Sequence, residues 1–232
     1  MPELLLNSPL LGLTLTIVIF HLGELLVKRL KTSLLPPFLF SSIVIIMLIT
    51  GIDELTLESY ERGGTFLAFF LGPATISLAL PLKRNWEVLR SNALILLLTA
   101  LVGAITAIIA TFYCARLFGA QEVTMLSLLP KSITTPVAME VSQSLGGLPP
   151  LTIVCVSLAG VFGALFGHKL LALVGVTDNI AIGFAIGTGS HALGTSSCIP
   201  KSAVQVTFAS LAIVLLAIAT TLIAPFMLGI LR

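Results

Sequence analysis

The stretch LPKSITTP at residues 129–136 places a lysine and three hydroxyl residues between two prolines. Each proline disrupts a helix, because it lacks the backbone N–H and restricts the residue before it. Inside a membrane protein, irregular backbone of this kind has to line a cavity or lie within protein. A helix that begins near Pro136 directs its positive end at an anion, and Lys131 adds a full charge. The candidate anion-binding residues are Lys131, Ser132, Thr134 and Thr135.

Lys131 has two interpretations that the sequence leaves open. A lysine within a membrane segment is costly and marks a functional site. A lysine in a short loop can instead extend its charge to the membrane surface. Glu140, in the next helix, is either a countercharge or proton site for the same cavity, or part of an exposed helix face.

A second polar stretch, GTGSHALGTSSCIPK, occupies residues 187–201. Its glycines allow the backbone to unwind or to pack closely, and His191 titrates near neutral pH. We expect Ser190, His191 and Thr195 to bind substrate opposite the first stretch. His191 would donate to a substrate oxygen or hold a coupling proton. The alternative is a packed His191 that is hydrogen-bonded to a neighbouring helix.

The composition indicates what kind of element positions these residues. Of the 232 residues, 57% are hydrophobic and 9% are charged, with a mean hydropathy of +1.13. A soluble domain has about 25% charged residues. Charge-free runs reach the roughly 20 residues that a spanning helix needs, so the sequence predicts an all-α protein within the lipid bilayer. The expected ordinary helices cover residues 9–30, 36–51, 64–82, 91–117, 150–174 and 203–231.

We predict a polytopic fold of about eight membrane segments, in which 121–145 and 179–199 are discontinuous. Broken helices that meet near the membrane midplane are typical of carriers built from inverted repeats. The chain is therefore expected to form a single transmembrane domain, 1–232, with two structurally related halves. The first half covers roughly 1–120, and the second, 121–232, holds both polar breaks. We also expect a homo-oligomer.

Other classes of function have little support in the sequence. Cys114, Cys155 and Cys198 are far apart and lack metal-ligand spacing, so neither a metal nor another cofactor is expected. GTGSHALG lies outside the context of a nucleotide loop or a serine nucleophile elbow, so we expect no enzyme. A net charge of +2 without a basic tail gives no indication of nucleic-acid binding. The function that the two polar stretches favour is transport of a small carboxylate. This function requires Lys131 and His191 to lie in one cavity.

Four stretches resemble a known family: LPKSITTPVAMEVSQSLGGLPPLT, GALFGHKLL, GTGSHALGT and FASLAIVL. Their order and spacing are similar to those of the LrgB/CidB family, which includes bacterial YohK-type proteins and the C-terminal half of the plastid glycolate/glycerate translocator. The resemblance covers roughly residues 60–231, and the first 60 residues agree in hydropathy only. Many relatives continue with an Ala-Arg pair and acidic residues where this chain has SSCIPKSAVQV, a difference that bears on selectivity.

The resemblance implies a multi-pass protein of the bacterial cell membrane that pairs with a small LrgA/CidA-type membrane protein. It also implies two functions. The plastid relative indicates transport of small monocarboxylates of the pyruvate, glycolate and glycerate class, and this is our main expectation because it agrees with the anion-binding residues. The alternative is a holin/antiholin-like regulator of murein hydrolase activity and lysis.

Overall fold

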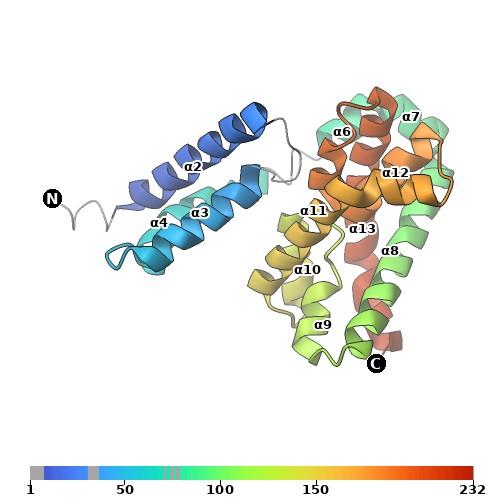
Figure 1. Ribbon diagram of the computed structural model, residues 1–232. Helices are drawn as coiled ribbons and strands as arrows, with labels where there is room; N and C mark the ends of the chain where they lie inside the picture. The colour runs from blue at the N-terminus through green and yellow to red at the C-terminus, as the bar shows by residue number, and fades with distance from the viewer. Residues whose placement is uncertain (1–7, 31–36, 71, 74–75, 77–78, 232) are drawn as a thin grey trace. The chain divides into compact units, whose positions relative to one another are not determined.

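The computed structural model describes residues 8–30, 37–70, 72–73, 76 and 79–231, apart from the side chains of residues 30, 39, 81 and 82. Every regular element in these residues is an α-helix, which confirms the all-α prediction (Figure 1). The chain forms two compact units, Met1–Ala74 and Thr75–Arg232, and each is described by itself. Both polar stretches lie in the second unit.

In the described residues of the first unit, the helices are α2 (Pro9–Leu30), α3 (Pro37–Gly51) and α4 (Leu57–Ala68). Helices α2 and α4 approach closely where two glycines meet, because a Cβ at Gly12 would lie 3.1 Å from the Cα of Gly63. The hydroxyls of Thr16 and Tyr60 are 3.0 Å apart and join the same two helices. A small-residue contact with a hydrogen bond beside it is a common way for apolar helices to associate in lipid.

The helices of the second unit are α6 (Ala79–Arg84), α7 (Trp86–Ser91), α8 (Ala93–Leu117), α9 (Glu122–Leu128), α10 (Thr135–Leu145), α11 (Pro149–Leu173), α12 (Asn179–Ser196) and α13 (Ala203–Leu231). Helix α13 is central, and its run from Leu211 to Ala217 is buried throughout. Its C-terminal part packs with α8, α9, α10 and α11 in the larger apolar core. Its N-terminal part packs with Phe184 of α12 and Leu96 of α8.

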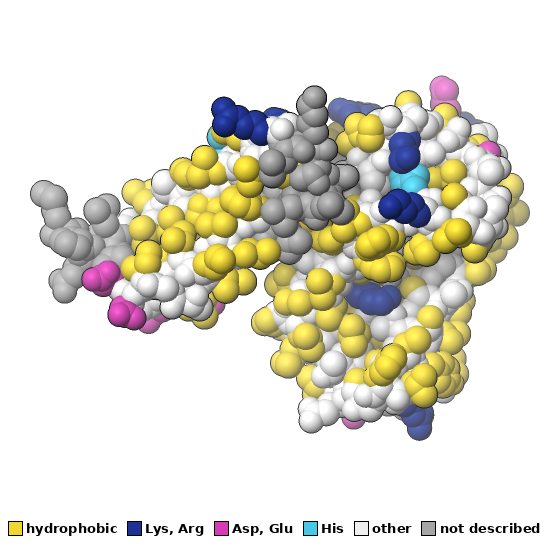
Figure 2. Space-filling model, in the orientation of Figure 1, with side chains coloured by type: hydrophobic (Ala, Val, Ile, Leu, Met, Phe, Trp, Pro, Cys, Tyr) yellow, Lys and Arg dark blue, Asp and Glu magenta, His cyan; other side chains and the backbone are white. Residues whose placement is uncertain are grey.

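Four helices among the described residues are long and apolar enough to cross a membrane: Pro9–Arg29, Ala93–Leu117, Pro149–Leu173 and Ala203–Leu231. Hydrophobic side chains are spread widely over the face seen in Figure 2, as expected of a surface that contacts lipid. The expected helix 64–82 falls partly outside the described residues. A total of about eight segments, their discontinuity and the inverted repeat stay predictions.

Helix α12 lies directly against α13 because glycines remove the side chains between them. A Cβ at Gly183 would lie 2.7 Å from the Cα of Gln205, and one at Gly187 would lie 2.8 Å from the Cα of Ala209. Contacts this short cannot be made with a Cβ in place. The spacing of four residues on both helices repeats the contact one turn later, which fixes the position of α12 and of the polar stretch that it contains.

A small polar network fixes the ends of the same helices. The side-chain amide of Gln205 donates to Oδ1 of Asn179 at 2.8 Å, and its Oε1 lies 3.0 Å from Nε2 of His168. The hydroxyl of Ser197 is 3.4 Å from the other ring nitrogen of His168. Side chains from α11, α12 and α13, with Ser197 just after α12, are thereby joined by hydrogen bonds that lipid cannot replace.

Candidate functional site

The first polar stretch connects α9 to α10 without helical structure. Helix α9 ends at Leu128 and α10 begins at Thr135. Within the connection, the N–H of Lys131 donates to the carbonyl of Leu128 at 3.0 Å, and the N–H of Ile133 donates to that of Pro130 at 3.2 Å. These turns use two of the N–H groups that the interruption of the helix leaves without helical partners. Fewer N–H groups are therefore available to a ligand than the sequence suggested.

A buried cluster of hydroxyls lies beside this connection, with Ser127 at the end of α9 next to it and Ser142 toward the far end of α10. The hydroxyl oxygen of Thr152, on α11, lies 2.6 Å from that of Ser142 and 3.0 Å from the carbonyl oxygen of Ser127. The hydroxyl of Ser127 in turn accepts from the N–H of Leu148 at 2.8 Å. All three hydroxyl residues are fully buried. Sequence analysis missed this cluster, because nothing local shows that residues 127, 142 and 152 meet.

The hydroxyls predicted to bind an anion have no partner within the described part of the chain. Ser132 is only 7% exposed, and its hydroxyl makes no hydrogen bond there. Thr134 is the N-cap residue of α10, yet its side chain forms no capping bond. The hydroxyl of Thr135 likewise makes no hydrogen bond to the described residues. The start of α10 therefore keeps polar groups unused, as a binding site would require.

The second polar stretch interrupts α12. The backbone leaves the helical region at Ser190 (φ −143°, ψ 15°) and at His191 (φ 41°, ψ −143°). His191 is the one residue other than glycine with positive φ among those described. Residues held in such backbone conformations cost about 1–3 kcal/mol each and gather at functional sites. The break thus falls at two of the residues that the sequence singled out.

His191 is buried against α11 and does not face open space. Its Nε2 lies 2.9 Å from the carbonyl oxygen of Val156, which can only accept, so the ring donates from Nε2. A Cβ at Gly160 would lie 2.7 Å from the same ring, and glycine there is what admits the imidazole. The hydroxyl of Thr195 donates to the carbonyl of His191 at 2.8 Å. Both side chains are thus engaged within the protein.

Glycine also admits Ser190 to α11. A Cβ at Gly163 would collide with the Ser190 side chain, including its hydroxyl. Gly160 and Gly163 of α11 therefore leave room for His191 and Ser190, the two residues at the break in α12. Sequence analysis did not single them out, although their spacing of three residues on one helix face is the kind of signal that indicates close packing.

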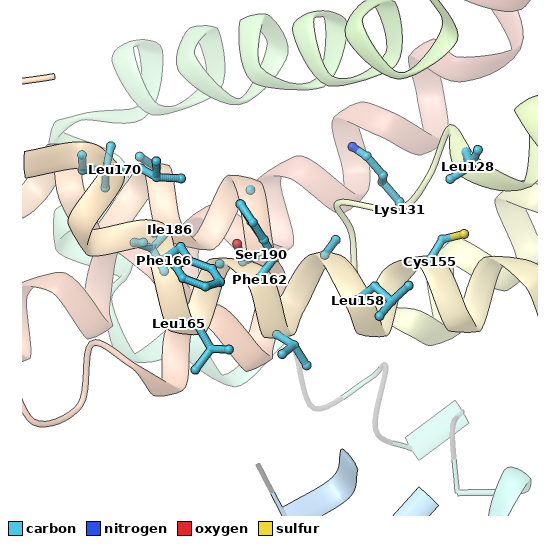
Figure 3. Close-up of a pocket in the computed structure, with 17 residues that line it drawn as sticks. Leu128, Lys131, Cys155, Leu158, Phe162, Leu165, Phe166, Leu170, Ile186 and Ser190 are labelled. Carbon is cyan, nitrogen blue, oxygen red and sulfur yellow. The ribbon is translucent and has the colours of Figure 1, made fainter. Parts of the chain in front are cut away.

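A cavity of about 760 Å³ brings the two polar stretches together. Lys131 and Ser190 both line it, together with a face of α11 and part of α12 (Figure 3). The other predicted binding residues, Ser132, Thr134, Thr135, His191 and Thr195, are not among its lining residues. Lys131 and Ser190 therefore line the same cavity, whereas the expectation was that Lys131 and His191 would do so.

Lys131 makes no ion pair or hydrogen bond through its side chain within the described residues. In Figure 3 it lies near Leu128, and Cys155 and Leu158 of α11 are the labelled side chains closest to it. Glu140, the possible countercharge, is exposed on α10 and is not part of the cavity lining. A lysine charge without a countercharge favours an anionic ligand.

Known proteins resemble this chain over most of its length. The model of the LrgB-like family matches residues 16–230. This chain belongs to the LrgB-like family. It is 32% identical over 218 residues to the antiholin-like protein LrgB of Bacillus cereus (strain B4264), which covers 94% of this chain and 95% of the relative. The antiholin-like protein LrgB of Bacillus anthracis (strain A0248) matches to the same extent. No solved structure matches.

The LrgB match confirms the family resemblance seen in the sequence and extends it. The resemblance by motif began near residue 60, whereas the family match begins at residue 16 and so includes most of α2. Both interrupted stretches and the whole of α11 lie within the matched residues. The cavity is therefore built entirely from the part of this LrgB-family chain that the family shares.

The buried hydroxyl cluster generates a prediction about stability. Thr152→Val keeps the shape of the side chain but removes the hydroxyl between Ser127 and Ser142. Because buried polar groups then lose a partner, we expect unfolding to be easier by about 1–3 kcal/mol, seen as a lower midpoint of thermal unfolding in detergent. Thr221→Val is the matched control, since that exposed hydroxyl bonds only within its own helix. Equal midpoints for the two variants would contradict the role of the cluster.

Proposed function

We propose that this chain is an antiholin-like membrane protein that restrains a holin-like membrane partner. The observation behind the proposal is the 32% identity, over nearly the full length of both chains, with proteins named antiholin-like protein LrgB. Similarity that runs from end to end supports a shared activity better than a match to one segment does. The four long apolar helices agree with action inside a membrane.

In finer detail, we place the protein in the bacterial cell membrane, where it acts with a small LrgA/CidA-type partner. Through that partner it would regulate murein hydrolase activity and lysis without catalysing a reaction itself. Helices of the second unit expose large apolar side chains, such as Leu94 and Leu98 on α8 and Phe226 on α13. Such faces suit contact with lipid, with a partner helix, or with a second copy of the chain.

A second candidate function is transport of small monocarboxylates of the pyruvate, glycolate and glycerate class. The observation in its favour is that Lys131 and Ser190, from the two interrupted stretches, line one cavity. The unused hydroxyls of Ser132, Thr134 and Thr135 at the start of α10 add further polar groups. Coupling to protons through His191 or Glu140 belongs to this proposal, with Thr195 supporting the backbone of His191.

The antiholin-like proposal predicts a change in membrane leakage. Liposomes that contain a holin-like partner and a trapped dye should leak more slowly when this chain is included. Lys131→Ala should restrain leakage as well as the wild type does, because restraint depends on contact between the proteins and not on the cavity. An unrelated membrane protein of similar size, at equal density, controls for crowding. Unchanged leakage in the presence of this chain would refute the proposal.

The carrier proposal predicts saturable uptake of labelled pyruvate, glycolate or glycerate into liposomes that contain this chain alone. Lys131→Ala should lower uptake by about tenfold or more, because a charge-assisted contact to the carboxylate is lost. Lys131→Arg should keep most of the uptake, and Lys201→Ala, at an exposed lysine outside the cavity, is the matched control. Uptake that does not saturate, or that is indifferent to Lys131→Ala, would rule out this function.

A further inference from the structure

The cavity is long and extends along α11. The α11 residues that line it run from Cys155 to Leu171, and Leu158, Phe162 and Phe166 among them recur every four positions. The rise over fifteen residues of helix, from Cys155 to Leu170, is about 22 Å. In Figure 3 the labelled side chains follow α11 in this order, with Lys131 near one end and Leu170 near the other. The space is therefore a groove along the helix and not a compact pocket.

The lining of this groove is apolar almost throughout. Apart from Lys131, Cys155 and Ser190, every side chain that lines it is hydrocarbon or is glycine. A volume of about 760 Å³ equals that of roughly 25 water molecules at about 30 Å³ each. A two- or three-carbon acid has only a handful of non-hydrogen atoms and fills a small part of this space. The sequence favoured a small carboxylate, whereas the size and lining of the groove favour a longer, largely apolar ligand.

The single charge lies at the end of the groove that is nearer the start of α11. Cys155 follows Pro149, the first residue of α11, by six positions, or about 9 Å along the axis. The 25 residues of α11 extend over about 37 Å, which exceeds the roughly 30 Å of hydrocarbon. Figure 3 shows Lys131 at the same end of the groove as Cys155, and a lysine near the start of a spanning helix can extend its charge toward a lipid head group.

The groove is also open toward the side from which a lipid would enter. Leu158, Phe162 and Phe166 line it, and their side chains are 60%, 56% and 43% exposed. In a membrane, the medium next to such residues is acyl chains. A chain can therefore enter sideways from the bilayer, while the phosphate of its head group meets the lysine that has no countercharge.

We propose that this groove holds one acyl chain of an anionic phospholipid, with the phosphate and anionic head group bound at Lys131. The chain runs along α11 past Phe162 and Phe166 toward Leu170. Selectivity for the head group comes from Lys131, and affinity for the chain comes from the apolar lining. The proposal requires neither antiholin-like action nor carboxylate transport, so it stands or falls separately from both.

The test measures lipid that is retained by the purified full chain. The protein is extracted from vesicles of equal parts phosphatidylglycerol and phosphatidylcholine, washed in detergent, and examined by native mass spectrometry. We expect one phosphatidylglycerol per chain, in preference to phosphatidylcholine. Lys131→Gln should lower its retention by about tenfold, because a charge-assisted contact is lost. Lys131→Arg should retain it, and Ala159→Phe, which fills the groove beside Lys131, should lower retention of both lipids.

Control variants distinguish lipid binding at Lys131 from an effect of overall surface charge. Lys201→Gln removes an exposed lysine outside the groove and should leave retention unchanged. Thermal unfolding of each variant in detergent shows whether the fold is kept. The proposal is overturned if both lipids are retained equally, if Lys131→Gln and Lys201→Gln behave alike, or if free palmitate is retained while phosphatidylglycerol is not.

Discussion

Hydrocarbon offers no partner to a backbone N–H or C=O group, and this constraint governs the second unit. Wherever a helix is interrupted, the protein itself has to hold the freed groups. Between α9 and α10 it does so with turns inside the connection and with the cluster of Ser127, Ser142 and Thr152 behind it. In α12 the hydroxyl of Thr195 donates to the carbonyl of His191, and the break packs against glycines of α11.

The sequence was sufficient to predict the helical class and the long apolar helices. These follow from composition and from proline and glycine chemistry, which are local properties of the chain. The partners of the interrupted segments could not be predicted in the same way. That Gly160 admits His191, or that Thr152 contacts Ser142, depends on how distant segments pack. The hydrogen bond from the ring of His191 to the carbonyl of Val156, likewise, could not be read from local sequence.

The proposals that involve the cavity all depend on the charge of Lys131. The family relationship favours an antiholin-like protein, and the cavity adds a lysine charge beside an apolar groove. A cation in such a place interacts strongly with any anion that enters, because little water screens the charge. A lipid in the groove and a small carboxylate near Lys131 would compete for the same charge. Regulation of a partner needs no such charge, so the role of Lys131 separates activities that depend on the cavity from those that depend on helix contacts.

The most direct measurement uses Cys155, which lines the same cavity as Lys131. In a chain with Cys114→Ser and Cys198→Ala, Cys155 is the remaining thiol for thiosulfonate reagents of opposite charge. If Lys131 faces an accessible cavity, the anionic reagent should react several-fold faster than the cationic one, and Lys131→Gln should abolish this preference. Equal rates for the two reagents, unchanged by Lys131→Gln, would show that the lysine charge does not face the cavity.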